Sequence, residues 1–149
     1  VQLVRSEDLS KAISSQMNFS NNGNFLAVSG YYTNGDVGSQ AIYVFKFDKH
    51  TGTFSDKRIV SLKTQQDINQ QIRLRSVEFS PNEKYLYTAG SRRTPTDSTF
   101  VLQCTNPFID PDDSLFRRVY TANRVAYTSI IQMGPDGRIY LPANVGKDS

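Results

Sequence analysis

The stretch Phe79-Ser80-Pro81-Asn82-Glu83-Lys84-Tyr85-Leu86-Tyr87 occurs in three versions along this chain of 149 residues. The first version, FSNNGNFLA, begins at Phe19, and the third, MGPDGRIYL, begins at Met133. The three versions align without a gap. Each passes from apolar residues through a turn rich in Pro, Asn, Asp and Gly into new apolar residues, and Gly23 and Gly137 supply the positive φ of a tight turn. The sequence therefore predicts three β-hairpins of one repeating unit.

The repeating unit is predicted to hold four strands. The offset from Phe19 to Phe79 is 60 residues, and that from Phe79 to Met133 is 54. Self-similarity at this length, with four short strands in each unit, is typical of a propeller blade. We therefore expect an all-β fold in which residues 1–149 form a β-propeller segment of about two and a half four-stranded blades. The units are expected at residues 13–62, 74–120 and 127–149, the last of them incomplete.

Each predicted strand is a short apolar run between turn residues. Both offsets exceed the ~40–45 residues of a WD40 blade, and the surplus is expected in loops at 33–40, 63–71 and 91–98. The chain has no Trp for a WD40 ending and no Gly-Gly pair for a kelch blade. The alternative fold is a β-sandwich, which also has short strands. The expected strands are 1–5, 13–19, 25–32, 41–47, 53–62, 74–79, 85–90, 99–105, 115–120, 127–133 and 138–143.

The composition bounds the partners. A net charge of +3 with scattered Lys and Arg gives no basic patch, so nucleic acid is not expected as a partner. No apolar run approaches the roughly 20 residues that span a bilayer, so direct membrane insertion is not expected. The single cysteine, Cys104, cannot form an internal disulfide and fits a buried apolar position. Because the third unit stops early, we expect the natural protein to continue past Ser149 and the isolated chain to associate.

The hairpins carry a resemblance to known proteins. Residues 79–87 resemble the FSPDGKYLY element of lactonase-type seven-bladed propellers. Residues 131–141 (IQMGPDGRIYL) resemble an element of large secreted propeller proteins of gliding-type bacteria, and residues 42–48 (IYVFKFD) with Thr51-Gly52 are similar to another strand of that family. In the second unit, residues 102–105 (LQCT) depart from this strand pattern. The resemblance implies a secreted or cell-surface bacterial protein, exported by the type IX route and associated with gliding motility or adhesion.

Residues able to support catalysis or bind a metal are few. His50, the single histidine, lies in the predicted turn 48–52, where a solvated side chain is expected. Without a second histidine, zinc and Cys-His chemistry lack their parts, and no Gly-x-Ser-x-Gly elbow presents a serine. The acids Asp110, Asp112 and Asp113 suggest weak calcium binding, but turn formation explains them better. We expect no catalytic residue, metal or cofactor, and so no enzyme.

Two further sets of residues are candidates for a site. Asn18, Glu78 and Gln132 share one register, each one residue before a hairpin turn segment, and either line a central channel or hydrogen-bond neighbouring units. Tyr31 and Tyr32, with Arg92 and Arg93, are the candidate binding residues, as an aromatic and basic rim suits protein or glycan.

The predicted function is that of a non-catalytic scaffold or binding module of a secreted bacterial surface protein. Its partner would be a protein or a glycan at the cell surface, bound through blade loops. One alternative is part of a lactonase-like propeller enzyme, whose active site would lie at the central channel. A second alternative is an intracellular protein-interaction propeller.

Overall fold

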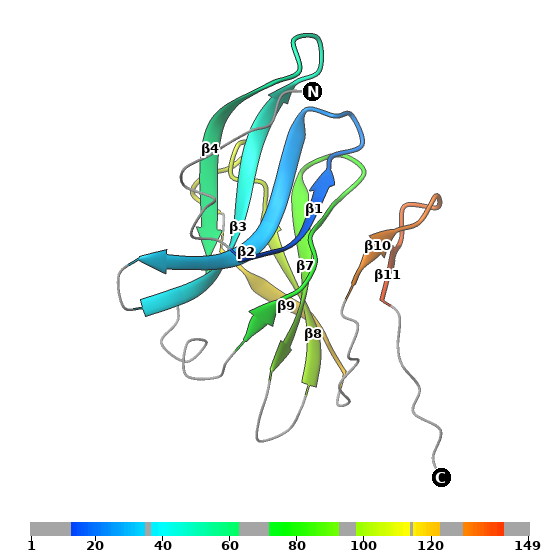
Figure 1. Cartoon of the computed structure of the whole chain (residues 1–149). Coiled ribbons are helices and arrows are strands. Elements are labelled where there is room, and N and C mark those ends of the chain that lie inside the picture. Colours follow the sequence, from blue (N-terminus) through cyan, green and yellow to red (C-terminus); the bar gives the residue numbers. More distant parts are fainter. Residues whose placement is uncertain are drawn as a thin grey trace.

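The computed structural model describes residues 13–34, 37–62, 72–92, 98–113, 115–122 and 130–141. Every regular element in these residues is a β-strand, and all strand pairs are antiparallel (Figure 1). The all-β prediction is therefore confirmed. The strands form three separate sheets, and within the described residues these sheets do not close into a barrel or a ring.

The first sheet is a four-stranded meander in the order β1-β2-β3-β4. Its turns are short, because Asn, Gly and Asp residues interrupt otherwise β-forming runs. The strands are β1 (Ile13–Phe19), β2 (Phe25–Asn34), β3 (Val37–Asp48) and β4 (Thr53–Ser61).

The second sheet repeats this order with an interrupted inner strand. Two short strands, β5 (Arg73–Leu74) and β6 (Glu78–Phe79), both pair with β7, and β8 and β9 follow outward. The three longer strands are β7 (Tyr85–Arg92), β8 (Ser98–Thr105) and β9 (Arg117–Ala122). The third sheet is the pair β10 (Gln132–Met133) and β11 (Ile139–Tyr140).

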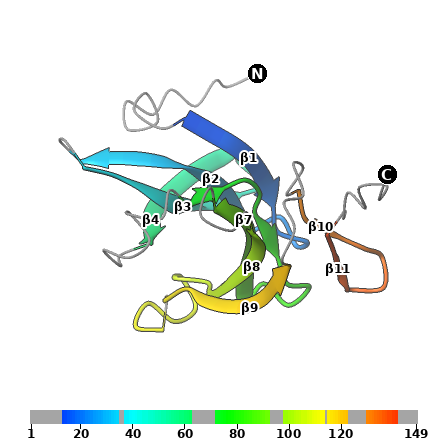
Figure 2. The ribbon, with the colours of Figure 1, turned by 90° about the horizontal axis from the view of Figure 1, so that it is seen from below.

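The inner strands of the three sheets are neighbours. β6 lies against β1 on one side and against β10 on the other. Seen from below, the outer strands β4 and β9 lie at the periphery, and β10 and β11 lie on the other side of β7 from β4 (Figure 2). The three hairpins thus occupy successive sheets, with their inner strands side by side.

Two predicted loops are shorter than expected. Residues 33–40 were predicted to form a loop, but β2 continues to Asn34 and β3 begins at Val37, so most of this stretch is strand. The reason is that Gly38 and Ser39 pair with Thr33 and Tyr32, which extends the ladder beyond the apolar core. The second predicted loop, 91–98, likewise begins only after Arg92. The predicted strand at residues 1–5, the bridge at 63–71 and residues 127–129 and 142–143 lie outside the described residues.

The three hairpin turns share one geometry in their first half. The backbone N–H groups of Gly23, Glu83 and Gly137 donate to the carbonyls of Ser20, Ser80 and Gly134 at 2.8, 2.9 and 3.0 Å. Gly23, Glu83 and Gly137 have φ values of 69°, 60° and 75°. A left-handed conformation is easy for glycine, but for Glu83 it is strained by about 1 kcal/mol or more.

The gapless alignment is wrong in the second half of the third hairpin. Phe19 pairs with Leu26 and Phe79 with Leu86, but Met133 pairs with Ile139, where the alignment requires Tyr140. The third turn is therefore one residue shorter than the others. Ile139, and not Tyr140, takes the place of Leu26 and Leu86.

Each of the two larger sheets has two apolar faces. We call the face that contains Ala27 in the first sheet and Tyr87 in the second sheet the front face, and the face that contains Leu26 and Leu86 the back face. The front face of the first sheet packs on the back face of the second in the largest core cluster, which includes Ala27, Val44, Leu86, Phe100 and Leu102. The front face of the second sheet packs on the third in a smaller cluster, formed by Ala89, Val101 and Ile131 with Tyr87, Ile139 and Leu141.

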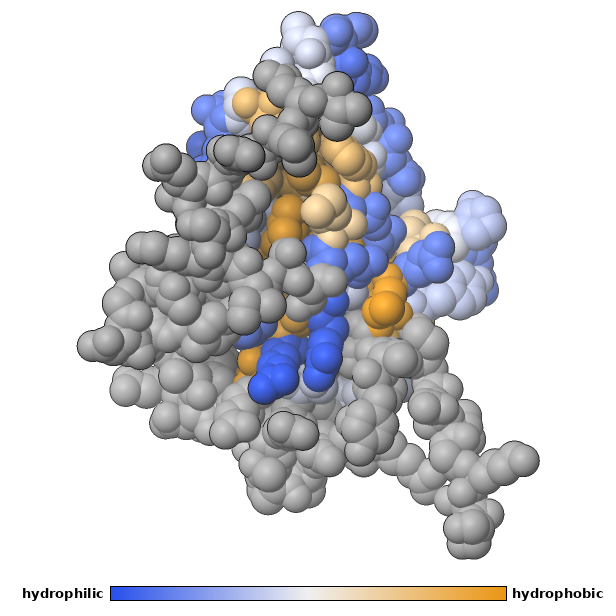
Figure 3. Space-filling view, viewed as in Figure 1, coloured by the Kyte–Doolittle hydropathy of each residue, from blue (hydrophilic) through white to orange (hydrophobic). Residues whose placement is uncertain are grey.

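The back face of the first sheet carries a cluster of aromatic side chains. Phe19 is 46% exposed there, and its ring lies 5.1 Å from that of Phe47. Phe47 in turn packs on Phe54 at 4.8 Å. Figure 3 shows hydrophobic residues on the side of the molecule where this sheet faces the viewer.

Gly90 provides a test of how Phe100 packs on the back face of the second sheet, where this sheet meets the first. A Cβ atom at Gly90 would lie 2.4 Å from Cε2 of Phe100, whose ring is fully buried. We expect Gly90→Ala to lower the free energy of unfolding by about 1–3 kcal/mol because the ring has no room to move. Chemical denaturation measures the change.

The matched control is the double variant Gly90→Ala/Phe100→Leu. If the clash with the ring is the cause, the smaller leucine restores part of the loss, and the two changes are not additive. Strict additivity, or an unchanged stability of Gly90→Ala, would contradict this packing.

Candidate functional site

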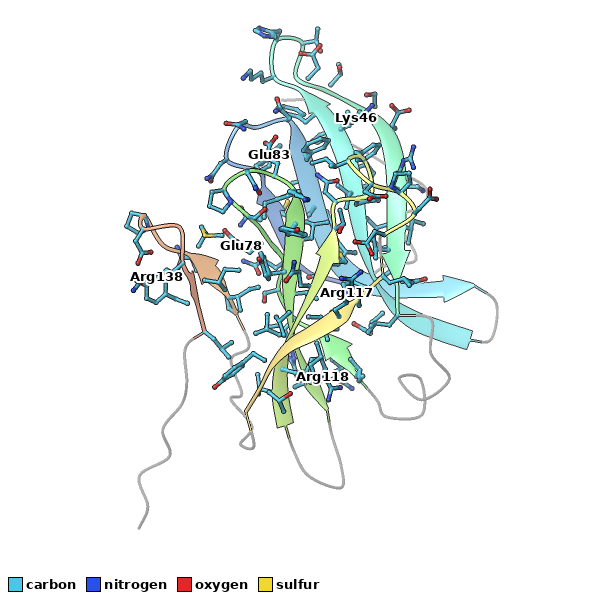
Figure 4. All side chains as sticks on the ribbon, turned by 180° about the vertical axis from the view of Figure 1, so that it is seen from behind. Lys46, Glu78, Glu83, Arg117, Arg118 and Arg138 are labelled. Atoms are coloured by element: carbon cyan, nitrogen blue, oxygen red, sulfur yellow. The ribbon has the colours of Figure 1, made fainter. Side chains whose placement is uncertain are left out.

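Glu78 joins all three sheets. It lies on β6, between β1 and β10, and its carboxylate accepts a hydrogen bond from the side-chain amide of Asn18 on β1. The same carboxylate accepts a hydrogen bond from the backbone N–H of Met133 on β10. Figure 4 shows Glu78 between the second sheet and the hairpin of β10 and β11.

The position of Glu78 is unusual for a carboxylate. The residue is 8% exposed, and this burial raises its pKa, although the hydrogen bonds from Met133 and Asn18 act in the opposite direction. Because burial disfavours the charged form, the two donors are needed to hold the carboxylate at this junction.

In the predicted column of Asn18, Glu78 and Gln132, the first two residues form hydrogen bonds between neighbouring sheets. Asn18 and Glu78 lie on the front faces of their sheets, and each points to the next sheet along the chain. Gln132 occupies the same face of the third sheet, where no described sheet lies in front of it, and it is exposed. Of the two roles considered for these residues, hydrogen bonding between units describes Asn18 and Glu78.

A second link between the sheets repeats in register. The Gln16 side-chain oxygen accepts a hydrogen bond from the backbone N–H of Val77 at 3.3 Å. One unit later, the Ser76 hydroxyl accepts from the backbone N–H of Ile131 at 3.1 Å. Gln16 and Ser76 are 60 residues apart, as are Phe19 and Phe79. The two junctions are therefore built in the same way, with different side chains.

Glu83 links the first two hairpin turns. Its carboxylate accepts hydrogen bonds from the Asn24 side chain at 3.1 Å, from the backbone N–H of Asn22 at 3.3 Å and from the Ser20 hydroxyl. Burial acts to raise the pKa of Glu83, but these hydrogen bonds together lower it. The third turn lies beside the second, since a Cβ at Gly137 would be 3.5 Å from Cγ of Pro81.

Asn106 extends this row of contacts outward. Its fully buried side chain donates to the carbonyl of Glu83 at 3.0 Å and accepts from the N–H of Phe108 at 3.1 Å. The ring of Phe108 then stacks on Phe25 at 5.7 Å. The loop after β8 is thus fastened to both larger sheets.

The sequence did not lead us to four residues with structural roles, which are Glu83, Asn106, Gln16 and Ser76. For Glu83 a signal existed. It stands where the other two turns carry glycine, and a non-glycine residue at a position that needs positive φ indicates a compensating interaction. The other three residues gave no such signal.

The residues considered for chemistry have structural roles. His50 is exposed, and its backbone N–H donates to Asp48 at 2.8 Å, which is the main reason why the pKa of Asp48 is lowered. Burial raises the pKa of the Cys104 thiol to about 12, so this thiol is protonated at neutral pH. Such a thiol is not poised as a nucleophile.

The acidic loop serves as a turn. Asp110 accepts hydrogen bonds from the backbone N–H groups of Asp112 and Asp113 at 3.2 and 3.3 Å. The Asp113 carboxylate also contacts Arg117 at 2.5 Å and the hydroxyl of Thr105 at 3.1 Å. No group of three potential metal ligands occurs among the residues that the structure describes.

The predicted binding residues are placed only by their backbone. Tyr31 and Tyr32 lie on β2, paired with Gln40 and Ser39, and Arg92 is the last residue of β7. Tyr32 and Arg92 hold corresponding places in the first two sheets, at the strand ends away from the hairpin turns. Their side chains, and Arg93 altogether, lie outside the described residues.

Comparison with protein-family models, with curated proteins and with solved structures finds no match to this chain. Within the described residues, no helix is long and apolar enough to cross a membrane.

The buried position of Glu78 predicts a pH dependence of stability. Because the folded-state pKa is raised above its ordinary value of 4.5, the folded state holds this proton more tightly than the unfolded chain. The contribution of Glu78 to stability is therefore greatest below pH 4.5 and falls as the pH rises towards its folded-state pKa. Relative to the wild type, Glu78→Gln is therefore expected to gain stability as the pH rises above 4.5. Urea unfolding across this range measures the difference.

Asp48→Asn is the matched control because the pKa of Asp48 is lowered. Its stability relative to the wild type should change in the opposite direction, falling as the pH rises, and this change lies around and below the ordinary pKa of 3.8, so the measurement is extended below pH 4. A flat or falling curve for Glu78→Gln would show that Glu78 has no raised pKa in the folded chain.

The link through Glu83 predicts a result that backbone preference alone would not give. Glu83→Gly relieves the left-handed strain of about 1 kcal/mol, yet it removes the acceptor of Asn22, Asn24 and Ser20. We expect a net loss of about 1–2 kcal/mol in the free energy of unfolding because the hydrogen bonds to a charged group outweigh the strain. In an Asn24→Ala background the loss should shrink, and a stabilising Glu83→Gly would contradict the link.

Proposed function

We propose that this chain is a segment of a β-propeller that serves as a non-catalytic binding module of a secreted bacterial surface protein. The observation that carries the proposal is the repeated junction between sheets. The side chains of Gln16 and Ser76 accept hydrogen bonds from backbone N–H groups of the next sheet, in the same register. Front face packs on back face at each junction. An arrangement in which each sheet packs on the next in the same way is typical of a propeller.

The hydrogen bonds and ion pairs of the carboxylates support a role in binding rather than in catalysis. Glu78 and Glu83 hold sheets and turns together, and Asp113 is paired with Arg117. Catalysis requires an acid, base or nucleophile free to meet a substrate. These carboxylates are instead part of the framework, which favours a scaffold over a lactonase-like enzyme.

The binding surface is proposed at the strand ends away from the hairpin turns. The backbone brings Tyr32 and Arg92 to corresponding ends of β2 and β7, next to Tyr31 and Arg93 in the sequence. Aromatic and guanidinium groups together supply most of the energy in many protein interfaces, and aromatic rings also stack on sugars. A cell-surface location and a protein or glycan partner are supported by the sequence resemblance.

The test is a binding screen of the full-length protein against glycans and surface proteins of its own cell. Changing Tyr31, Tyr32, Arg92 and Arg93 together to Ala is expected to weaken binding by at least about tenfold, because hot-spot residues each contribute about 2 kcal/mol or more. Surface plasmon resonance measures the loss.

The matched control changes Asn21, Asn82 and Asp136, exposed residues of the hairpin turns, to Ala. It should leave binding unchanged. An ester- or lactone-hydrolysing activity that Glu78→Gln abolishes without unfolding the protein would replace this proposal by the enzyme.

A further inference from the structure

Gln40 connects the far end of β2 to the inner strand of the second sheet. It lies on β3, where it is paired with Tyr31 of β2. Its side-chain oxygen accepts a hydrogen bond from the backbone N–H of Leu74 on β5 at 2.9 Å. The strand end that carries Tyr31 and Tyr32 therefore lies beside β5, and the proposed binding surface extends onto this strand.

Two arginines flank Leu74 in the sequence. Arg73 and Arg75 are both exposed, whereas Leu74 between them is buried in the largest core cluster. Alternate residues of an extended chain lie roughly 6–7 Å apart, so the two arginines stand next to each other on the surface. Arg73 is paired with Ser91, and this pairing brings the backbone of Arg92 beside them. The structure thus places a row of arginine positions along this end of β5 and β7.

Neither Arg73 nor Arg75 is paired with an acid in the part of the chain that the structure describes. The described carboxylates other than Glu78 lie near the hairpin turns, at the opposite end of the sheets. They belong to Asp48, Asp56, Glu83, Asp110, Asp112, Asp113 and Asp136. Neighbouring positive charges without an acid repel each other, and an anionic ligand would relieve this repulsion.

The backbone around the two arginines already has partners. The N–H of Leu74 is bound by Gln40, and the N–H of Arg75 donates to the carbonyl of Ala89 at 2.8 Å. An extended peptide is bound at a sheet largely through backbone hydrogen bonds, and these two N–H groups cannot supply them. The surface instead offers charged side chains next to tyrosine positions, which suits a ligand recognised by its acidic groups and its rings.

We propose that the ligand of this surface is an acidic glycan, a polysaccharide with carboxylate or sulfate groups, and that Arg73 and Arg75 bind these groups. The inference rests on the proposed function, because it names the ligand class of the same binding surface. A guanidinium group binds such an oxyanion through two parallel hydrogen bonds. The row of arginines is confined to the ends of two strands, whereas binding to a nucleic acid usually involves a longer series of phosphate contacts.

The test measures binding of the full-length protein to three immobilised polymers. Polygalacturonate carries carboxylates, dextran sulfate carries sulfates, and dextran is uncharged. We expect saturable binding to polygalacturonate or dextran sulfate and none to dextran, and the tighter of the two identifies the acidic group. The binding should weaken as the salt concentration rises, because salt screens exposed charges.

The double variant Arg73→Gln/Arg75→Gln tests the site. It is expected to weaken binding to the acidic polymer at least about tenfold, because charge-assisted hydrogen bonds are lost. The matched control is Lys49→Gln/Lys84→Gln, which removes two exposed positive charges at the hairpin-turn end and should leave binding unchanged. All four side chains are exposed, so the urea midpoints of both variants should equal that of the wild type.

Four outcomes overturn this inference. One is the absence of binding to both acidic polymers, and another is equal weakening by the two double variants, which means attraction to net charge alone. Tighter binding of polyglutamate or DNA at the same salt concentration replaces the glycan by an acidic peptide or a nucleic acid. Binding of a neutral glycan or a surface protein that the fourfold alanine variant weakens, but Arg73→Gln/Arg75→Gln does not, overturns the inference and keeps the proposed function. If the fourfold alanine variant leaves every binding unchanged, the proposed function fails as well.

Discussion

The hydrogen bonds to the carboxylate of Glu78 hold the three sheets at one point. Asn18 of the first sheet and the backbone of Met133 in the third both donate to it. A buried carboxylate is costly unless its oxygens are satisfied, and here one donor comes from each neighbouring sheet. An apolar side chain would pack equally well but would accept packing in several registers. We interpret Glu78 as the residue that fixes which strand lies opposite which.

Packing of the apolar faces stabilises the structure, and the polar link through Glu78 determines how these faces are placed against one another. A sheet with two apolar faces is unstable alone, since exposed apolar area costs about 25 cal/mol per Å². Stacking front on back buries both faces of an internal sheet, as in the second sheet of this chain. Among the described strands, the back face of the first sheet and the front face of the third remain uncovered, and they account for the exposed Phe19 at one end and the exposed Tyr140 at the other.

Much of this arrangement could be predicted from the sequence. The turn residues gave the three hairpins because Gly23, Gly137 and their neighbours prefer the conformations that turns need. The register of Asn18, Glu78 and Gln132 also followed from the alignment. The partners of Glu83 could not be predicted, because they lie on another turn about 60 residues away and no local pattern encodes such a contact. The length of β3 was missed for a related reason, since the ladder from Val37 to Gln40 depends on pairing and not on apolar content.

The shortened third turn shows how strongly the apolar faces constrain the chain. Side chains of a strand alternate between faces, so a shift of one residue exchanges the two sets. With the pairing of the first two hairpins, Tyr140 would face the second sheet and Ile139 would point away from it. Removal of one residue from the turn reverses this, so that Ile139 and Leu141 pack on the second sheet while Tyr140 is exposed. The partial burial of these two aliphatic side chains, each a fraction of the about 1.5–3 kcal/mol of full burial, outweighs the preference for an identical turn. The three units therefore keep the same buried and exposed faces, whereas the length of their turns differs.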